Sequence, residues 1–282
     1  MLTRIVKLGI SLVVAAWDSV IGLVRRLVHL DGCPQVAILY YHEIRPDRRE
    51  RFSWQLDQLT RLARPVRADL RTPPRGRGRC AAITFDDAFV SMLENAVPEL
   101  VRRGIPFTVF APSGNLGDRP RWIVDANHPC YHERVMTGAQ LRELSATPLA
   151  VIGSHGVAHA NLQTLTDAES ELEITQSNRE LEAILGRPVE LLSFPHGAYQ
   201  DRHVAIARRS GYSRAYSILP DSRQLFGGEF VVGRVHAETE DWHIETRLKL
   251  RCAYRWLPLA FAAKRAVTGL LGRGSRGAWS ST

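Results

Sequence analysis

The segment Ala81-Ala82-Ile83-Thr84-Phe85-Asp86-Asp87 decides the fold class, because a short apolar run ends there in two consecutive acids. Runs of the same kind recur along the chain between residues 36 and 233. The other six are 36–41, 107–110, 150–153, 190–194, 214–216 and 230–233. Short apolar runs separated by helical stretches predict an α/β fold with a parallel sheet. Seven of them predict that this sheet closes into a distorted (β/α)7–8 barrel.

Helical stretches between these runs carry recognisable end signals. Residues 91–103 stop at Gly104, and glycine commonly ends helices. Residues 167–185 follow Thr166, which can cap the helix together with Glu169 three positions on. The leucines of this second stretch that are expected to face the core are Leu172, Leu181 and Leu185. Both stretches fit the alternation of strands and helices that a barrel requires.

Residues able to bind metals or protons lie just beyond four of the predicted strands. They are His42, Asp86 and Asp87, His155, and the triplet Pro195-His196-Gly197. Because the C-terminal ends of parallel strands meet at one rim of a barrel, these residues are expected to lie close together. The sequence therefore predicts a functional site at this rim.

The spacing of His155 and His159 suits a shared metal ion, since four residues bring two rings to one face of a helical turn. Two histidines and one carboxylate leave open positions on a divalent cation, which favours hydrolysis. Each motif alone also has a plainer explanation. Asp86 and Asp87, which on a strand would point to opposite sides, can begin a capped helix, and paired histidines are often surface or core residues.

Three motifs together resemble those of polysaccharide deacetylases, the NodB-homology group known as carbohydrate esterase family 4. Residues 83–87 (ITFDD) resemble the T-F-D-D motif, and residues 154–162 (SHGVAHANL) resemble the H-[ST]-x-x-H motif. Residues 193–197 (SFPHG) lie where the third motif, R-x-P-[FY]-G, is expected. The order and separations agree over residues 36–235. The resemblance implies a NodB-type barrel for a catalytic domain spanning residues 33–245.

The resemblance implies a role for each matching residue. Asp86 would be the general base, and the backbone N–H of His196 would hold the developing oxyanion. The metal ligands would be Asp87, His155 and His159. The substrate would be lined by Phe194, Pro195 and Gly197. The implied cofactor is a divalent metal, Zn²⁺ in the first place, with Co²⁺ or Mn²⁺ as alternatives.

The acid that protonates the leaving amine is implied to be His42. Residues 38–44 (ILYYHEI) look like the opening "YH" strand of the subgroup that includes poly-N-acetylglucosamine deacetylases, in which the acid histidine comes first. His236 is the nearest late alternative, but an apolar-strand setting is not expected there. The sequence departs from the motifs at three positions. Ser193 replaces an arginine, which predicts a less depressed pKa for Asp86. His196 replaces an aromatic residue, and Gly156 replaces a hydroxyl residue that steadies the histidine loop.

Both ends of the chain predict contact with a membrane. Residues 1–32 form an apolar helix with one polar stripe, which can be an interfacial or signal-anchor helix, a cleaved signal peptide, or a helix packed on the domain. Residues 246–282 are basic and amphipathic, with eight basic residues from Arg247 onward and no acid. This tail can account for the whole net charge of +8, so an anionic surface is expected and a nucleic-acid partner is not.

These features predict a metal-dependent hydrolase that removes N-acetyl groups from amino sugars of a polysaccharide or lipid-linked glycan. It is expected at a membrane in a cell-envelope pathway, with neither the membrane face nor an oligomeric state set by the sequence. Two alternatives remain: a deformylase or other small-amide hydrolase on the same fold, and a non-catalytic, membrane-associated glycan-binding protein. The four scattered cysteines predict neither a disulfide framework nor a zinc ribbon.

Overall fold

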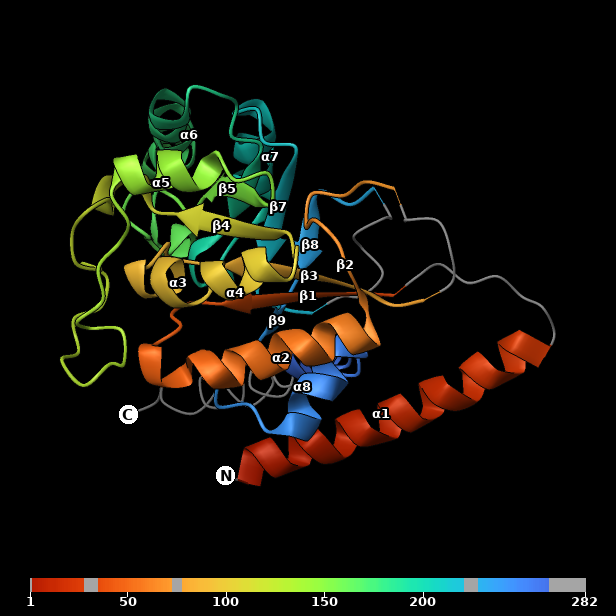
Figure 1. Cartoon of the computed structure of the whole chain (residues 1–282). Helices are drawn as coiled ribbons and strands as arrows, with labels where there is room; N and C mark the ends of the chain where they lie inside the picture. The colour runs from red at the N-terminus through yellow and green to blue at the C-terminus, as the bar shows by residue number, and fades with distance from the viewer. Residues whose placement is uncertain (1, 28–34, 73–77, 221–227, 264–282) are drawn as a thin grey trace, which may run out of the picture.

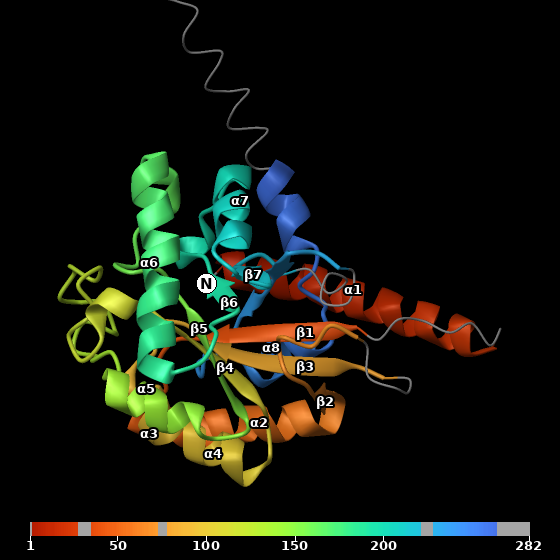
Figure 2. The same cartoon turned by 90° about the horizontal axis from the view of Figure 1, so that it is seen from above.

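The computed structural model describes residues 2–27, 35–72, 78–220 and 228–263. Its centre is a parallel sheet with the strand order β8-β7-β6-β5-β4-β3-β1-β9, and β2 pairs with β3. Helices surround this sheet (Figures 1 and 2). The predicted α/β barrel is therefore confirmed.

The strands are β1 (Val36–Tyr41), β2 (Arg64–Pro65), β3 (Cys80–Phe85), β4 (Phe107–Ala111), β5 (Ala150–Ser154), β6 (Leu191–Ser193), β7 (Arg214–Ser217), β8 (Val231–Gly233) and β9 (Val235–His236). The helices are α1 (Leu2–Leu27), α2 (Arg49–Leu62), α3 (Val90–Asn95), α4 (Val97–Arg102), α5 (Gly138–Ser145), α6 (Asp167–Leu185), α7 (Asp201–Arg209) and α8 (His243–Leu250). Short 3₁₀ turns lie at η1 (Pro46–Arg48), η2 (Ser113–Asn115), η3 (Leu162–Thr164) and η4 (Pro195–Gly197).

The β8–β9 segment closes the sheet into a ring. β8 pairs with β7 and β9 pairs with β1, although only Arg234 separates the two short strands. The Arg234 N–H donates to Ser217 O at 3.1 Å, and the Ala237 N–H donates to Tyr40 O at 2.9 Å. One stretch of chain thus joins both edges of the sheet, and Arg234 lies at the junction.

Buried side chains separate into an inner and an outer cluster, as the alternation of a strand requires. The smaller cluster includes Ile38, Phe110 and Tyr216 and fills the inside of the ring. The larger cluster includes Leu56 of α2 and Leu181 of α6, so it lies between the strands and the helices. The ring is therefore packed through its centre, and a site can form only at its ends.

The predicted helices are confirmed with two corrections. Helix α6 has the predicted bounds and the Thr166–Glu169 capping box, but Leu172 is 54% exposed and so does not face the core. Residues 91–103 form two helices, α3 and α4, instead of one. Pro98 causes the second difference, since proline has no N–H to donate and is accommodated in the first turn of α4.

Helices α2, α8 and α1 lie on one side of the barrel (Figure 1). The larger core cluster includes Leu248 and Leu250 of α8 and continues to Tyr254, so the compact part of the chain extends past residue 245. Cys80, Cys130 and Cys252 are free and buried. Residues 264–282 of the expected basic segment lie outside the described residues.

Candidate active site

Asp86 and Asp87 lie directly after β3, at the C-terminal end of the barrel. The chain turns as it leaves the strand, and Asp87 and Ala88 adopt left-handed backbone conformations with φ of 67° and 52°. This turn brings both carboxylates to the wall of one cavity. The expectation that strand geometry would point them to opposite sides is therefore wrong. Strained non-glycine backbone of this kind, costing roughly 1–3 kcal/mol, is typical of functional sites.

His155 and His159 are joined by an irregular loop and not by the expected helical turn. Glu173 of α6 steadies this loop by accepting hydrogen bonds from the Val157 N–H at 2.9 Å and the Ala158 N–H at 3.1 Å. Gly156 has a φ of 77°, and a Cβ atom there would lie 2.9 Å from Glu173 Oε2. Glycine at this position therefore makes room for the carboxylate, which holds the loop without a hydroxyl residue.

The side chains of Asp87, His155 and His159 form a compact cluster, with one ligand atom from each within 4.8 Å of the others. The Nδ1 atom of His155 hydrogen bonds Ser193 O at 2.7 Å, so its Nε2 atom faces the aspartates. The Nε2 atom of His159 lies 3.2 Å from Asp87 Oδ1. That buried oxygen has no hydrogen-bond partner within the described part of the chain. An orphaned carboxylate oxygen beside two imidazole nitrogens fits a divalent cation, because leaving it unpaired is costly.

His155 is held in the form that binds metals, and a neighbouring group orients the ring of each histidine in this cluster. Burial lowers the pKa of His155 to about 4, so its ring is neutral at pH 7. The ring of Trp122 stacks on His159 with 4.6 Å between centroids and an angle of 17° between the planes. The His155 ring is thus oriented by a carbonyl and the His159 ring by an indole.

Asp86 is buried, although it lines the cavity, and it is paired with Arg234. The guanidinium donates to Asp86 Oδ1 at 2.7 Å and to Oδ2 at 2.8 Å, and it also donates to Ser193 Oγ at 2.7 Å. Burial alone would raise the pKa of Asp86, but the charge of Arg234 holds it below its usual value. The expected loss of positive charge at Ser193 is therefore wrong. Arg234 supplies that charge from the strand junction, and serine at 193 provides a further acceptor.

His42 and His236 lie side by side at the rim. Their ring centroids are 5.5 Å apart, and the Tyr40 ring contacts both of them, at 5.7 Å and 4.9 Å. His236 belongs to β9, which corrects the expectation that it lacks a strand setting. Desolvation, and then the charges of His42 and Lys249, lower the pKa of His236, so it is a poor proton donor at neutral pH.

His196 lies at the cavity wall, within the turn η4 after β6, with a left-handed φ of 57°. Its ring meets that of His159 at 4.6 Å. Phe194 is fully buried and stacks on Tyr199 at 4.8 Å, and Pro195 is buried close to Gly156. Neither of these two expected lining residues is at the cavity wall, whereas His196 is.

Gly197 is the last residue of the same turn, where Ile218 packs closely against its backbone. It has a φ of 63°, and a Cβ atom there would lie 2.4 Å from Ile218 Cγ1. Ile218 itself lines the cavity, whereas Gly197 does not. Glycine at 197 thus allows Ile218 to approach the backbone closely.

The site opens into a cavity of about 800 Å³. Its wall contains His42, the two aspartates, the two histidines of the cluster, His196 and His236. Trp122 and Glu238 also line the cavity. The residues that the sequence brings to one rim are therefore together in space, at the wall of one cavity.

Comparison with known families decides what this site belongs to. A family model described as polysaccharide deacetylase matches residues 74–215, which is half of the chain. The chain belongs to the polysaccharide deacetylase family. Membership places it among the carbohydrate deacetylases, a class of hydrolases, and its substrates accordingly among N-acetylated glycans.

Individual deacetylases resemble this one over most of their length. YxkH of Bacillus subtilis, whose name assigns it to the polysaccharide deacetylases, is 23% identical over 212 residues and 71% of each chain. IcaB from Ammonifex degensii shares the fold with a TM-score of 0.64, at 23% identity over 77% of this chain and 97% of its own. A de-N-acetylase from Aggregatibacter actinomycetemcomitans gives a TM-score of 0.62, at 16% identity over 76% and 99% of the two chains.

Three residues at this deacetylase site were not found from the sequence. Glu173 and Trp122 lie in stretches without a motif. The sequence does contain a signal for Arg234, because it is the one charged residue in the otherwise apolar segment 230–235. It comes two residues after Val232, which belongs to the inner cluster, so strand alternation places Arg234 on the inner face of the ring. The matched segment 74–215 contains neither Arg234 nor His42, so both join the site through strands at the seam of the ring.

Proposed function

We propose that this deacetylase removes N-acetyl groups from amino sugars of a polysaccharide or lipid-linked glycan with the help of a divalent metal ion. The observation that carries the proposal is the orphaned Asp87 oxygen facing His155 and His159, directly beside the charge-paired Asp86. These residues fit Zn²⁺, and Co²⁺ or Mn²⁺ suit the same donors. A bound divalent cation supplies Lewis-acid activation of water and of the amide carbonyl.

The residues of the chain divide the remaining work. Asp86 accepts the proton of the attacking water, and Arg234 holds its carboxylate in one orientation and in the ionised form. The backbone N–H of His196, at the cavity wall, stabilises the charge that develops on the acetyl oxygen. The amide bond then breaks to give acetate and an amine.

His42 protonates the departing amine in this proposal. It lies at the cavity wall just after β1, the strand that pairs with β9 at the seam. Its neighbour His236 has a lowered pKa and so is neutral at pH 7, which suits an acceptor and not a donor. His236 therefore contacts and orients His42 instead of replacing it.

The proposed location is a membrane. The helix that spans residues 2–25 is long and apolar enough to cross a bilayer by length and composition. The C-terminal segment from residue 246 adds basic and aromatic residues suited to anionic headgroups. A glycan carried by a lipid, or emerging at the membrane, would reach an enzyme held there, and the compartment is then that of cell-envelope synthesis.

The proposal is tested by measuring acetate release from N-acetylglucosamine oligomers after chelation, with and without added Zn²⁺ or Co²⁺. We expect metal-dependent release by the wild type. Asp86→Asn should lower kcat by about 10² to 10⁴, the usual contribution of a general base, while metal binding persists. Release that is unaffected by chelation would contradict the metal assignment. No release from any oligomer, with metal still bound, would limit the substrate to a lipid-linked or different amide.

The acid assignment is tested by comparing His42→Ala with His236→Ala. The first should lower kcat by about 10² or more, because the amine would leave unprotonated. The second should have a smaller effect, because His236 acts through His42. A matched control is His243→Ala, a histidine on α8 that stacks on Trp54 at 3.9 Å outside the cavity. The reverse order of effects would assign the acid to His236.

A further inference from the structure

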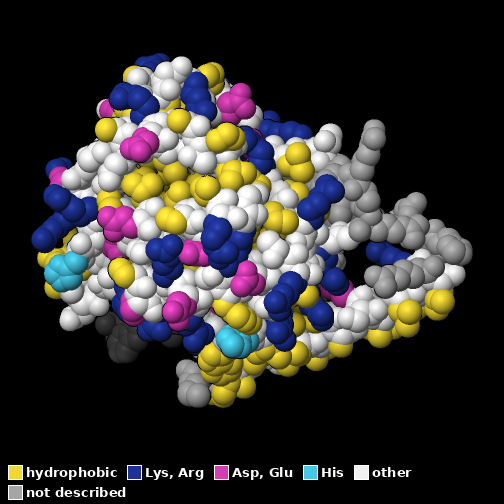
Figure 3. All heavy atoms as spheres, in the orientation of Figure 1, with side chains coloured by type: hydrophobic (Ala, Val, Ile, Leu, Met, Phe, Trp, Pro, Cys, Tyr) yellow, Lys and Arg dark blue, Asp and Glu magenta, His cyan; other side chains and the backbone are white. Residues whose placement is uncertain are grey.

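Helix α1 turns its apolar side away from the protein. Eleven of the eighteen large hydrophobic side chains that are exposed among the described residues belong to this one helix. Figure 3 shows these side chains along the outer edge of α1. A contiguous apolar face of this size marks a surface that something else covers.

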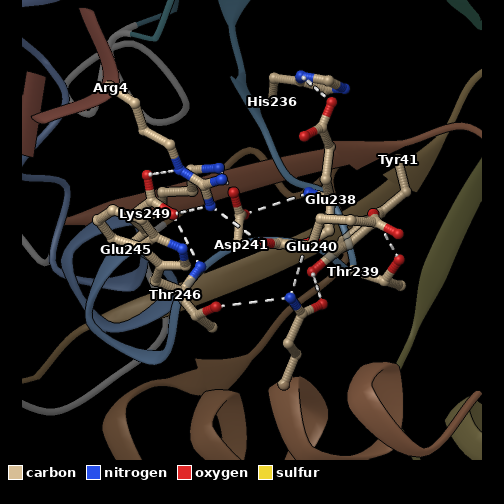
Figure 4. Close-up of polar contacts among 12 residues, drawn as sticks. Arg4, Tyr41, His236, Glu238, Thr239, Glu240, Asp241, Glu245, Thr246 and Lys249 are labelled. Carbon is tan, nitrogen blue, oxygen red and sulfur yellow. Dashed lines mark hydrogen bonds and ion pairs between the residues drawn. The ribbon is translucent and has the colours of Figure 1, made fainter. Parts of the chain in front are cut away.

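The N-terminal end of the polar stripe is fastened to the domain through Arg4. Its Nε atom donates to Glu245 Oε1 at 2.8 Å, and Nη2 donates to the carbonyl of Glu240 at 2.9 Å (Figure 4). The guanidinium also lies over the Trp242 ring, 4.5 Å from its centre. Arg4 thus binds the helix to α8 and to the loop that precedes it.

Two further contacts fasten the stripe along its length. Ser11 is fully buried and accepts a hydrogen bond from Trp256 Nε1 at 3.0 Å. Asp18 receives the guanidinium of Arg255, with Nη2 to Oδ1 at 2.6 Å. Arg4, Ser11 and Asp18 recur every seven residues, so they form one line on the helix. The predicted polar stripe is therefore the docking face of α1.

These contacts decide how the helix can meet a bilayer. From Arg4 to Asp18 the docked line is about 21 Å long at 1.5 Å per residue. A docked helix that crossed the membrane would draw Glu245, Asp241 and Lys249 of the adjoining domain into hydrocarbon, which is costly for charged groups. A docked helix that lies flat exposes only its apolar side to lipid. Docking and spanning thus exclude each other.

The charges around α1 favour a lipid surface over a second protein copy. The acid of the helix, Asp18, is paired with Arg255, while Lys7 and Arg25 are exposed. The sequence beyond residue 263, which lies outside the described residues, contains Lys264, Arg265, Arg273 and Arg276 and no acid. A second copy would bring the same cations face to face, whereas anionic headgroups would neutralise them.

We infer that α1 is an in-plane anchor, with its apolar face in one leaflet of an anionic bilayer and its polar face docked on the catalytic domain. The inference deepens the membrane location in the proposed function and rests on it.

The inference also places the active site relative to the membrane. A second cavity, of about 350 Å³, is lined by Thr3, Arg4 and Lys7 of α1 and by Tyr40 and His236 of the active-site wall. The site is therefore next to a cavity that the first turns of the anchor line, which places it near the level of the headgroups in this inference.

The test measures the depth of nitroxide labels on the full chain bound to phosphatidylcholine vesicles with and without phosphatidylglycerol. Labels are placed by Leu2→Cys, Val13→Cys and Val24→Cys, exposed positions that share one side of the helix because eleven residues make about three turns. Cys33 is replaced by serine, and the three buried cysteines are left in place. An in-plane helix gives one shallow depth for all three labels, about 5–10 Å below the headgroups.

Flotation of the vesicles supplies the matched control. Val13→Glu should lower vesicle binding on the order of tenfold, because it places a charge in the lipid-facing side. Leu172→Glu, an exposed leucine on the distant helix α6, should leave binding unchanged. A Val13 label much deeper than the other two would show a spanning helix and overturn the inference. The inference would also be overturned if the protein did not float with vesicles and its labels were shielded from solvent in the absence of lipid. That result would mean that a second copy of the chain covers α1. Neither readout requires turnover, so acetate release tests the site separately.

Discussion

Arg234 and Asp86 form an ion pair that is buried on every side. Their side chains are 0% and 4% exposed, and both oxygens of the carboxylate are paired. Removing water from two charges costs several kcal/mol each, which the bidentate contact and the bond to Ser193 must offset. The main effect of the ion pair is thus to keep Asp86 ionised and oriented, and its net contribution to the free energy of unfolding is small.

Replacing Arg234 leaves Asp86, the proposed general base, without its partner. We expect Arg234→Met to lower the free energy of unfolding by about 3–5 kcal/mol, the usual cost of stranding a buried charge. Urea unfolding at neutral pH measures this loss. Arg234→Lys keeps the charge but not the two-pronged contact, so it should fold more stably than the methionine variant and still show a reduced kcat. Arg121→Met, at a 73% exposed side chain, should cost little. Equal stability of all three variants would refute the assignment.

Residue types near the strand ends could be predicted from the sequence, and their partners could not. Asp86, Asp87, His155 and His159 follow motifs of fixed spacing, and the structure places all four at one cavity. The contact between Asp86 and Arg234 joins residues 148 positions apart and exists only because the ring closes. No local pattern encodes such a contact.

Secondary-structure elements show the same division between local and distant causes. The bounds of α6 could be predicted because Thr166 and Glu169 cap it within one turn. The exposure of Leu172 could not, because the inner face of α6 carries Glu173, which reaches the histidine loop, and Ser177, which bonds Ser154 Oγ at 2.7 Å. These polar contacts place Glu173 and Ser177 on the buried side of α6. Leu172 is therefore left on the exposed side, although its hydrophobic side chain predicted burial.

Helices α2 and α4 are clamped together by Glu99. This carboxylate accepts from Arg49 at 3.0 Å, Arg102 at 2.9 Å and Arg103 at 2.7 Å. Hydrogen bonds from Arg102 and Arg103 lower the pKa of Glu99 to about 2. Three arginines around one acid make the ionised form essential to this contact.

The clamp predicts a defined pH dependence of stability. Since the pKa of Glu99 is lower in the folded state than the usual value of 4.5, its contribution is complete above that value and is lost as the pH falls toward 2. We expect Glu99→Gln to cost about 1–2 kcal/mol at neutral pH, allowing for screening by solvent. The difference should vanish near pH 2 in urea unfolding. A cost that stays constant with pH would mean that packing, and not charge, holds α4 to α2.

The whole molecule should be stabilised by the metal that its site fits. Binding to the folded state alone adds about 2.7 kcal/mol at a metal concentration of 100 Kd. For a domain of this size that corresponds to a rise in Tm of about 5 °C or more. Thermal unfolding with Zn²⁺ after chelation measures the rise. Asp87→Asn should abolish it, and Asp118→Asn, an exposed carboxylate outside the cluster, should keep it. An equal rise in both variants would place the metal elsewhere.

The seam at Arg234 sets the order in which the protein can become active during its synthesis. Val235 of β9 pairs with Leu39 of β1, so the first strand of the barrel completes its pairing only after the last strand has been synthesised. Until the ribosome has released that final strand, β1 is an open sheet edge, which invites pairing with other chains. Through the same interval Asp86 is without its cation, and His42 is without His236 beside it. A nascent chain therefore lacks part of the proposed catalytic centre, and we expect one that stalls before residue 234 to be inactive and prone to aggregate.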